Sequence, residues 1–270
     1  MEYGKVYLVP TPIGNLKDIT LRALEVLENV DEIAAEDTRQ SLKLLNHFNI
    51  KKPLFSYHQH NEQGKSDEIL SKLESGKNIA IVTDAGTPGI SDPGSVIVKK
   101  CIENNISFEV LPGATAITTA LVYSGLDTTK FIFRGFIPRE TKERKILTEE
   151  IKDKKETLIF YESPHRLIES LDYLKKSLGN RNIAVCRELT KLHEDIYRGT
   201  IEEAYNWFLE NKPRGEFVLV ISGKTESEIK AEKEQELSGI SVEQQLINLI
   251  NSGIDKKEAI KLVAVILIFH

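Results

Sequence analysis

The chain has 270 residues, 40% apolar and 29% charged, which is the composition of a soluble globular protein with one large domain or two ordinary ones. Its formal net charge of −5 argues against a protein that coats nucleic acid by bulk charge. The two cysteines form no CxxC pair or His/Cys cluster, which excludes a disulfide or zinc framework, so we expect no metal. Without a signal-peptide pattern or a bilayer-length apolar stretch, we expect a cytoplasmic protein with no membrane contact.

The first part of the chain alternates short apolar runs with helical patterns. The expected strands cover residues 5–9, 31–36, 53–60, 79–82 and 107–111. The expected helices cover residues 20–27, about 40–48, 61–76 and 94–104. Asn61 is the expected cap of the third helix, and Ser91 or Asp92 that of the fourth, with Pro93 in its first turn. This alternation predicts an α/β fold with a parallel sheet covered on both faces.

A second α/β set follows residue 113. Its expected strands cover residues 131–136, 157–161, 182–186, 196–200 and 215–221. Its expected helices cover residues 114–123, 140–152, 164–178 and 201–211. The spacer between Arg187 and Ile196 is too short for a crossover helix, so we expect mixed strand order. We therefore predict an N-terminal α/β domain over 1–113 and a C-terminal mixed α/β domain over 114–223. A charged linker or exposed helix at 224–236 and two short helices, 241–251 and 256–268, would complete 224–270.

Three loops rich in glycine and proline each follow a predicted strand: Thr11–Asn15, Asp84–Gly94 and Pro112–Ala116. Successive strands of a parallel sheet end at one edge, so the three loops are expected to meet there. Any one of them fits an ordinary turn. The three together, with Asp84 and Asp92 among them, favour a ligand pocket. The dinucleotide fingerprint GxGxxG is absent.

Acidic and basic side chains also cluster after predicted strands, at 36–39, 162–166 and 187–191. Each cluster fits either a structural ion-pair network or a set of catalytic groups. The stretch Arg134–Lys155 holds eight Lys/Arg against five Asp/Glu, which makes it net +3. Taken alone, it is interpreted as a solvated helix face.

Seven segments match one family pattern in order: VPTPIGNLKDITLRALE, AAEDTR, TDAGTPGISDPG, LPGATA, FRGFIPR, FYESPHR and REL-TK-HE-…-RGT. Together they resemble the ribosomal small-subunit methyltransferase I family of the tetrapyrrole methylase superfamily. The resemblance implies two α/β domains with S-adenosyl-L-methionine between them, and a homodimer. It also implies 2′-O-methylation of a cytidine in the decoding region of 16S rRNA, within the small ribosomal subunit. The end of the chain, AVILIFH, departs from the charged continuation expected of the family.

The resemblance also implies roles for individual residues. The expected cofactor site consists of Pro10, Pro12, Ile13, Asp84, Ala85, Gly86, Pro88, Gly89, Ile90, Ser91, Gly113, Ala114, Thr115, Ala116 and Phe217. The candidates for a general base are Glu36, Asp37, Glu162 and Glu188, and the sequence does not choose among them. The side chains suited to phosphates are Arg39, Arg166, Arg187 and Lys191. The basic stretch at 134–155 then gains a role as an RNA contact, beside its interpretation as a solvated helix face.

Two alternatives stay open at the level of sequence. A methylase of the same fold acting on a tetrapyrrole or a protein side chain would have an apolar trough between its domains, without convergent Arg and Lys. A non-catalytic protein that holds the cofactor or rRNA would bind the cofactor without transferring a methyl group.

Overall fold

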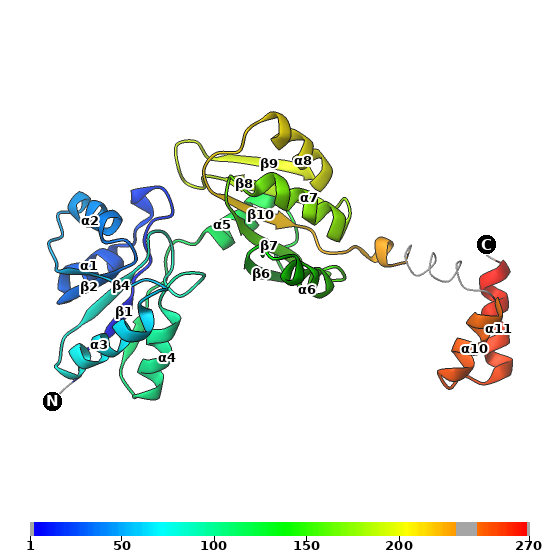
Figure 1. Cartoon of the computed structure of the whole chain (residues 1–270), viewed down its shortest axis with the longest axis horizontal. Helices are drawn as coiled ribbons and strands as arrows, with labels where there is room; N and C mark the ends of the chain where they lie inside the picture. Colours follow the sequence, from blue (N-terminus) through cyan, green and yellow to red (C-terminus); the bar gives the residue numbers. More distant parts are fainter. Residues whose placement is uncertain (1–2, 231–241, 269–270) are drawn as a thin grey trace.

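The computed structural model describes residues 3–230 and 242–268 (Figure 1). Two sheets with their own helices lie next to one another, and a pair of helices follows at the C-terminal end. We refer to β1 through β5 with their helices as the N-terminal domain, and to α5 through β10 as the C-terminal domain. No helix among the described residues is long and apolar enough to cross a membrane.

The sheet of the N-terminal domain is entirely parallel, as the sequence predicts. Its strands are β1 (Val6–Leu8), β2 (Glu32–Ala35), β3 (Leu54–Ser56), β4 (Ile79–Val82) and β5 (Phe108–Val110). They lie in the order β3-β2-β4-β1-β5. The loops that follow these strands therefore all lie at the carboxyl edge of the sheet.

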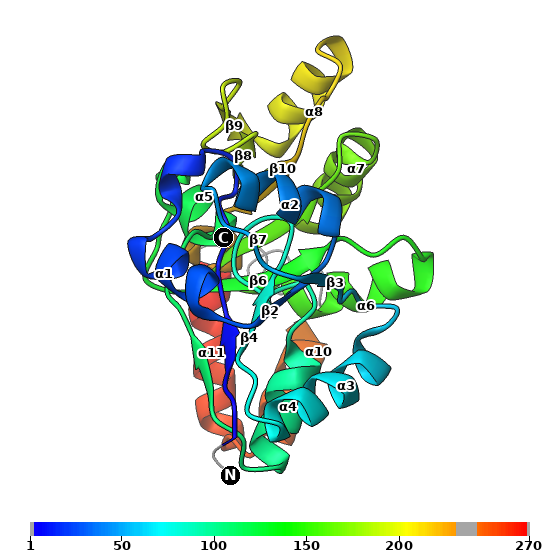
Figure 2. The same cartoon turned by 90° about the vertical axis from the view of Figure 1, so that its left-hand side faces the viewer.

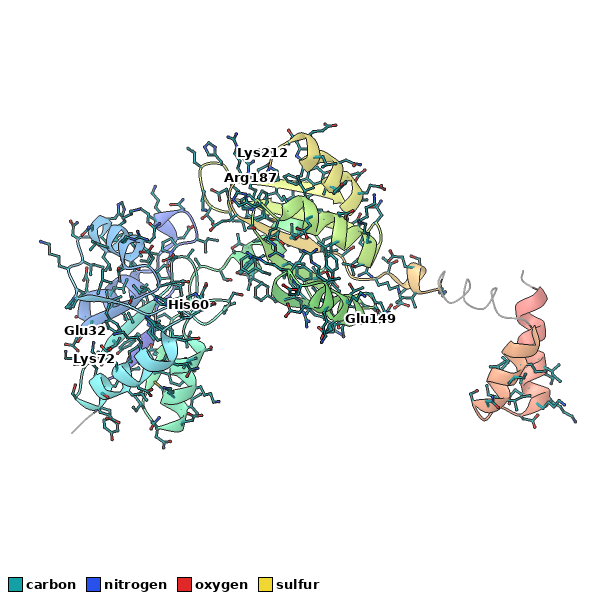
Figure 3. All side chains as sticks on the ribbon, in the orientation of Figure 1. Glu32, His60, Lys72, Glu149, Arg187 and Lys212 are labelled. Carbon is teal, nitrogen blue, oxygen red and sulfur yellow. The ribbon has the colours of Figure 1, made fainter. Side chains whose placement is uncertain are left out.

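Helices cover both faces of this sheet (Figure 2). They are the 3-10 helix η1 (Leu16–Asp18), α1 (Leu21–Asn29), α2 (Thr38–His47), α3 (Glu62–Glu74) and α4 (Ser95–Glu103). Ile79 and Ile81 pack with α3 and α4, whereas Ala80 and Val82 pack with α1 and α2. Burial on both faces explains why β4 is a continuous apolar run. Glu32, the first residue of β2, forms an ion pair with Lys72 of α3 at 2.6 Å, at the opposite end of the strand from the loop that follows it (Figure 3).

The sheet of the C-terminal domain is mixed, which confirms the expectation drawn from the short spacer between Arg187 and Ile196. Its strands are β6 (Phe131–Phe136), β7 (Thr157–Glu162), β8 (Asn182–Arg187), β9 (Asp195–Thr200) and β10 (Phe217–Ile221). They lie in the order β6-β7-β10-β8-β9, and only the β6–β7 pair is parallel. The helices α6 (Thr141–Ile151), α7 (Leu167–Leu178) and α8 (Ile201–Glu210) pack on one face. Helix α5 (Ala116–Ser124) covers the other face.

The two C-terminal helices, α10 (Val242–Asn251) and α11 (Lys256–Ile268), pack against one another. The predicted linker begins with a short helical stretch at 226–230. The rest of the linker, 231–236, lies outside the described residues.

Several predicted helix starts are wrong, and the errors fall beside the loops of interest. Helix α4 begins at Ser95, because Gly94 precedes it with φ 141°, a value that no helix accommodates. Pro93 is therefore outside the helix, and neither Ser91 nor Asp92 caps it. Asn61 does precede α3, but its side chain accepts a bond from the His58 amide instead of capping the helix. Helices α5 and α7 start two and three residues later than expected, which leaves longer loops at the sheet edges.

Candidate active site between the two domains

The three glycine- and proline-rich loops meet at the carboxyl edge of the parallel sheet, as predicted. Thr11 and Gly86 exchange two backbone hydrogen bonds, of 2.9 and 3.0 Å, which join the loop after β1 to the loop after β4. The Thr87 hydroxyl donates to the Ala114 carbonyl at 3.2 Å, which joins the loop after β4 to the loop after β5. The three loops therefore form one connected surface.

Two glycines of this surface are required for different reasons. Gly86 has φ 86°, which side-chain-bearing residues rarely adopt, whereas a Cβ there would meet its neighbours at an ordinary 3.5–3.6 Å. At Gly113 a Cβ would lie 2.4 Å from the Cβ of Pro10. Gly86 thus sets the path of the loop, and Gly113 allows two loops to approach closely.

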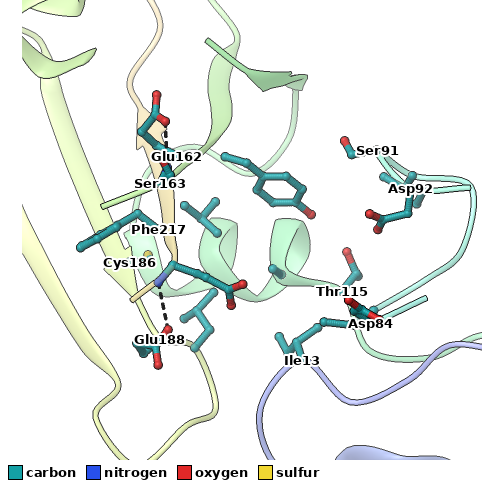
Figure 4. Close-up of a pocket in the computed structure, with 18 of the residues that line it drawn as sticks. Ile13, Asp84, Ser91, Asp92, Thr115, Glu162, Ser163, Cys186, Glu188 and Phe217 are labelled. Atoms are coloured by element: carbon teal, nitrogen blue, oxygen red, sulfur yellow. Dashed lines mark hydrogen bonds between the residues drawn. The ribbon is translucent and has the colours of Figure 1, made fainter. Parts of the chain in front are cut away.

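A cavity of about 400 Å³ lies between these loops and the second sheet (Figure 4). That volume falls in the range of about 300–1,000 Å³ of small-molecule sites. The lining from the first domain and the start of α5 is Ile13, Glu36, Asp84, Ala85, Gly86, Thr87, Ile90, Ser91, Asp92, Thr115 and Ala116. The lining from the rest of the second domain is Phe136, Tyr161, Glu162, Ser163, Pro164, Cys186, Glu188, Leu189, Lys191, Glu216, Phe217 and Val218.

The residues predicted to bind a cofactor divide into a lining group and a supporting group. The lining group is Ile13, Asp84, Ala85, Gly86, Ile90, Ser91, Thr115, Ala116 and Phe217. The group outside the lining is Pro10, Pro12, Pro88, Gly89, Gly113 and Ala114. Members of the second group hold the loops in place; the Gly89 amide, for example, donates to the Pro93 carbonyl at 3.1 Å. Phe217 borders the cavity, but its ring packs against Phe208 with centroids 5.8 Å apart.

One wall of the cavity carries three carboxyl groups: Glu36 after β2, and Asp84 and Asp92 in the loop after β4. The Asp84 amide donates to Glu36 Oε2 at 3.4 Å. None of the three forms an ion pair with another described residue. Burial, together with the charges of Glu36 and Asp84, raises the pKa of Asp92 to about 7. Burial also raises the pKa of Glu36 and of Asp84. This wall can therefore hold or exchange protons near neutral pH.

Glu188 lies on the opposite wall and is already engaged (Figure 4). Its Oε1 accepts from the Glu216 amide and from Lys191 Nζ, both at 2.9 Å. Burial works to raise the pKa of Glu188, but the Lys191 ammonium and the Glu216 amide outweigh it and hold the pKa below its usual value. Lys191 lines the cavity and also pairs with Glu216 at 2.7 Å, so its charge is balanced within the wall.

Glu162 borders the cavity at the end of β7, but its carboxylate belongs with Arg166 to a buried network on the far side of the strand. Residues alternate in direction along a strand, so Glu162 points to the face opposite Tyr161, toward α7. Its fully buried carboxylate accepts from the Ser170 hydroxyl at 2.5 Å and the Ser163 amide at 2.8 Å. Arg166 lies 3.6 Å from this carboxylate and donates to the Ile137 carbonyl. Both side chains are used within the fold, although both were candidates for a role in the site.

Asp37 and Arg39 lie beside the cavity without lining it. Asp37 caps α2 by accepting from the Arg39 amide at 2.8 Å, and its carboxylate binds the Arg39 guanidinium through two further bonds. These bonds lower the pKa of Asp37 to about 2, which makes it a weak base. Arg187 also lies outside the lining, and its guanidinium donates to the His193 carbonyl at 3.4 Å (Figure 3).

Sequence reasoning missed several lining residues, most clearly Tyr161 and Phe136. Tyr161 lies within the motif FYESPHR, and the alternation along β7 shows that it and Glu162 cannot face the same way. Burial, with a contribution from the Asp92 charge, raises the pKa of the Tyr161 hydroxyl to about 12. Phe136 had no comparable signal in the sequence, because an irregularity of β6 determines its direction.

The comparison with known protein families gives the class of this chain, which is that of the tetrapyrrole methylases. A sequence profile of the tetrapyrrole (corrin/porphyrin) methylases matches residues 5–205. The fold resembles solved structures of uroporphyrin-III-C-methyltransferase from Thermus thermophilus (TM-score 0.59, 21% identity, 80% of this chain and 94% of that one) and of diphthine synthase (TM-score 0.62, 14% identity, 82% and 91%). At these identities the likeness concerns the fold alone.

More similar relatives carry the name ribosomal RNA small subunit methyltransferase I. The relative from Halalkalibacterium halodurans is 49% identical over 97% of this chain and 90% of its own. That from Bacillus subtilis is 48% identical over 98% and 90%. That from Thermotoga maritima is 46% identical over 82% of this chain and 99% of its own. The chain therefore belongs to the ribosomal RNA small subunit methyltransferase I family of the tetrapyrrole methylases.

Proposed function

We propose that this protein uses S-adenosyl-L-methionine to methylate the ribose 2′-hydroxyl of a cytidine in the decoding region of 16S rRNA, within the small ribosomal subunit. The names of the relatives support the rRNA substrate. The observation that carries the proposal is a cavity with two different walls: one holds three carboxyl groups that have no ion-pair partner among the described residues, and the other combines apolar side chains with the mutually paired Glu188, Lys191 and Glu216. Such a cavity fits a ligand that has both a flat apolar part and a positive charge.

The lining fits S-adenosyl-L-methionine group by group. Cys186, Leu189 and Val218 offer apolar surface for an adenine ring. Glu36 and Asp84 offer negative charge to a sulfonium or an ammonium group. When bound, this cofactor supplies an electrophilic methyl group on a positively charged sulfur. The buried thiol of Cys186, whose pKa burial raises to about 12, stays protonated and does not compete as a nucleophile.

Asp92, which lines the cavity and has a pKa raised to about 7, is our first candidate for the general base, and Glu36 is the second. A ribose hydroxyl is a weak acid, so a base that takes its proton speeds the transfer by about 10²–10⁴-fold. A base is most effective when its pKa lies near the working pH, which favours Asp92 over Asp37 and Glu188. Alignment of the hydroxyl with the methyl group lowers the activation barrier further, by up to about 7–11 kcal/mol.

We also propose a cytoplasmic homodimer with a domain boundary at residue 113. The packing of α5 on β8 and β10 supports that boundary. An apolar surface supports self-association: Val122 of α5 is 75% exposed and Leu192 in the β8–β9 loop is 92% exposed. The Tyr123 hydroxyl donates to Glu194 at 3.0 Å, which places the helix and the loop side by side.

Transfer of a tritiated methyl group to small subunits from cells that lack this gene tests the proposal. We expect label in 16S rRNA, resistant to alkaline hydrolysis at one cytidine, because a 2′-O-methyl group blocks cleavage there. Label on a base, or cofactor binding without RNA label, would overturn the proposal. The second outcome would favour a non-catalytic role or a different substrate.

A further inference from the structure

A large aromatic side chain stands at the mouth of the cavity. Phe136 lines the cavity, yet it is 53% exposed. The other exposed large apolar side chain of the lining, Ile90, is 39% exposed. An aromatic ring that is open to solvent beside a catalytic cavity is available to a substrate that arrives from outside.

An irregularity in β6 turns this ring toward the cavity. Phe133 pairs with Ile159 and Phe136 pairs with Tyr161, so three steps along β6 match two steps along β7. The extra residue, with Gly135 at φ 65°, is a β-bulge. In a regular strand Phe136 would face away from Phe133. The bulge instead places both rings beside Tyr161, with centroids 4.9 and 5.7 Å from its ring.

The chain just after Phe136 is held firmly. Arg166 donates to the carbonyls of Ile137 and Pro138, and Arg144 Nε donates to the Pro138 carbonyl at 2.8 Å. The side chain of Ile137 is buried. The network around Glu162 and Arg166 therefore fixes the backbone beneath the exposed ring, so that ring can meet a partner with little loss of conformational entropy.

Cationic side chains follow Phe136 in the sequence. Arg139, Lys142 and Lys145 are exposed, and none of them has an ion-pair partner among the described residues. Other cations of the same stretch are paired; Arg144 with Glu169 and Lys152 with Glu149, each at 2.6 Å, are examples. The chain after Phe136 therefore presents three exposed cations without ion-pair partners, interspersed with the exposed Glu140 and Glu143, and a phosphate backbone could contact these cations.

We propose that Phe136 is a stacking platform for the base of the target nucleotide, while the ribose of that nucleotide enters the cavity. Recognition of unpaired RNA bases commonly uses aromatic side chains in this way, with phosphates held by adjacent Lys and Arg. The inference rests on the proposed function and makes Phe136 a positioning residue. This role explains why a β-bulge turns the exposed Phe136 ring toward the cavity, and why Arg166 and Arg144 hold the backbone that follows it.

Methyl transfer to unmethylated small subunits, with Phe136 replaced by Ala, Leu or Trp, tests this role. For Phe136→Ala we expect kcat/KM for the subunit to fall about 5- to 150-fold, the effect of a lost base stack. Phe136→Leu keeps apolar volume without a π face and should fall to a similar level, whereas Phe136→Trp should restore activity to within about 3-fold of the wild type. Calorimetry should show the same cofactor affinity for all three.

Phe131→Ala is the matched control, because Phe131 lies at the other end of β6, is 43% exposed and is not part of the cavity lining. It should leave kcat/KM unchanged. Full activity in Phe136→Leu would overturn base stacking, as would a loss of cofactor affinity or of the dimer in Phe136→Ala. If the wild-type protein labels no small-subunit RNA, the proposed function fails instead.

Discussion

The end of β7 and the loop after β4 both border the cavity, and their carboxyl groups have different partners. At the end of β7, the carboxylate of Glu162 is fully buried and accepts from Ser170 and Ser163, with Arg166 beside it. In the loop after β4, Asp84 and Asp92 line the cavity without an ion-pair partner among the described residues; Asp84 accepts from the Asp37 amide at 3.1 Å, and burial still raises the pKa of both. A carboxylate with all its partners inside the fold fixes a loop. A carboxylate that lines the cavity without an ion-pair partner is available to a ligand or a proton.

The largest effect should come from Asp92→Asn. The amide keeps the shape but accepts no proton, so we expect the rate of methyl transfer to fall about 10²–10⁴-fold. Single-turnover assays on small subunits measure this loss, and calorimetry should show cofactor affinity within a few-fold of the wild type. A rate within 3-fold of the wild type would show that Asp92 is not the base, and Glu36→Gln would then be the next variant to assay.

The same substitution should increase stability above neutral pH. The pKa of Asp92 is raised on folding, so the folded protein holds a proton that the unfolded chain releases at lower pH. The stability from this group is complete below pH 4 and is lost as the pH rises through about 7. Asp92→Asn should therefore raise the melting temperature at pH 8 and change it little at pH 4. A lower melting temperature at pH 8 would contradict a buried, unpaired charge.

An intermediate effect is expected for Gly86→Val. A β-branched residue at φ 86° strains the loop by about 1–3 kcal/mol, which should lower unfolding stability and weaken cofactor binding together. Gly125→Ala is a matched control, because Gly125 has φ 72°, open space around it and no place in the cavity lining. It should lose some stability and keep cofactor affinity. Equal cofactor affinity in wild type and Gly86→Val would argue against a cofactor on this loop.

The smallest effect on chemistry should come from Glu162→Gln. Loss of the charge leaves buried partners poorly satisfied, so we expect unfolding stability to fall by about 1–3 kcal/mol. Below the melting transition, kcat should stay within about 3-fold of the wild type. Denaturant unfolding and steady-state assays at low temperature measure both. A large fall in kcat with unchanged stability would place Glu162 in the reaction.

The sequence predicts both sheets and the meeting of three loops. Apolar runs, glycine-rich loops and the alternation of strands with helices can each be recognised from neighbouring residues alone. The sequence does not show that Glu162 is used within the fold and Asp92 is not, because both follow apolar runs. That distinction depends on whether Ser170, eight residues later, and Arg166 fold back onto the carboxylate. The direction of Phe136 depends on a bulge whose pairing with β7 spans distant residues. Tertiary structure therefore decides which carboxylate receives hydrogen bonds and ion pairs from other parts of the chain and which remains available to a ligand.

The pH dependence of kcat/KM for S-adenosyl-L-methionine, in wild type and Asp92→Asn, tests the central claim most directly, since it reports the base in the cofactor-free enzyme. We predict that wild-type kcat/KM rises with pH through an apparent pKa of about 7, set by burial of Asp92 near Glu36 and Asp84 and opposite Tyr161. This limb should disappear in Asp92→Asn and leave a low, flat profile. An identical limb in both proteins would contradict the account.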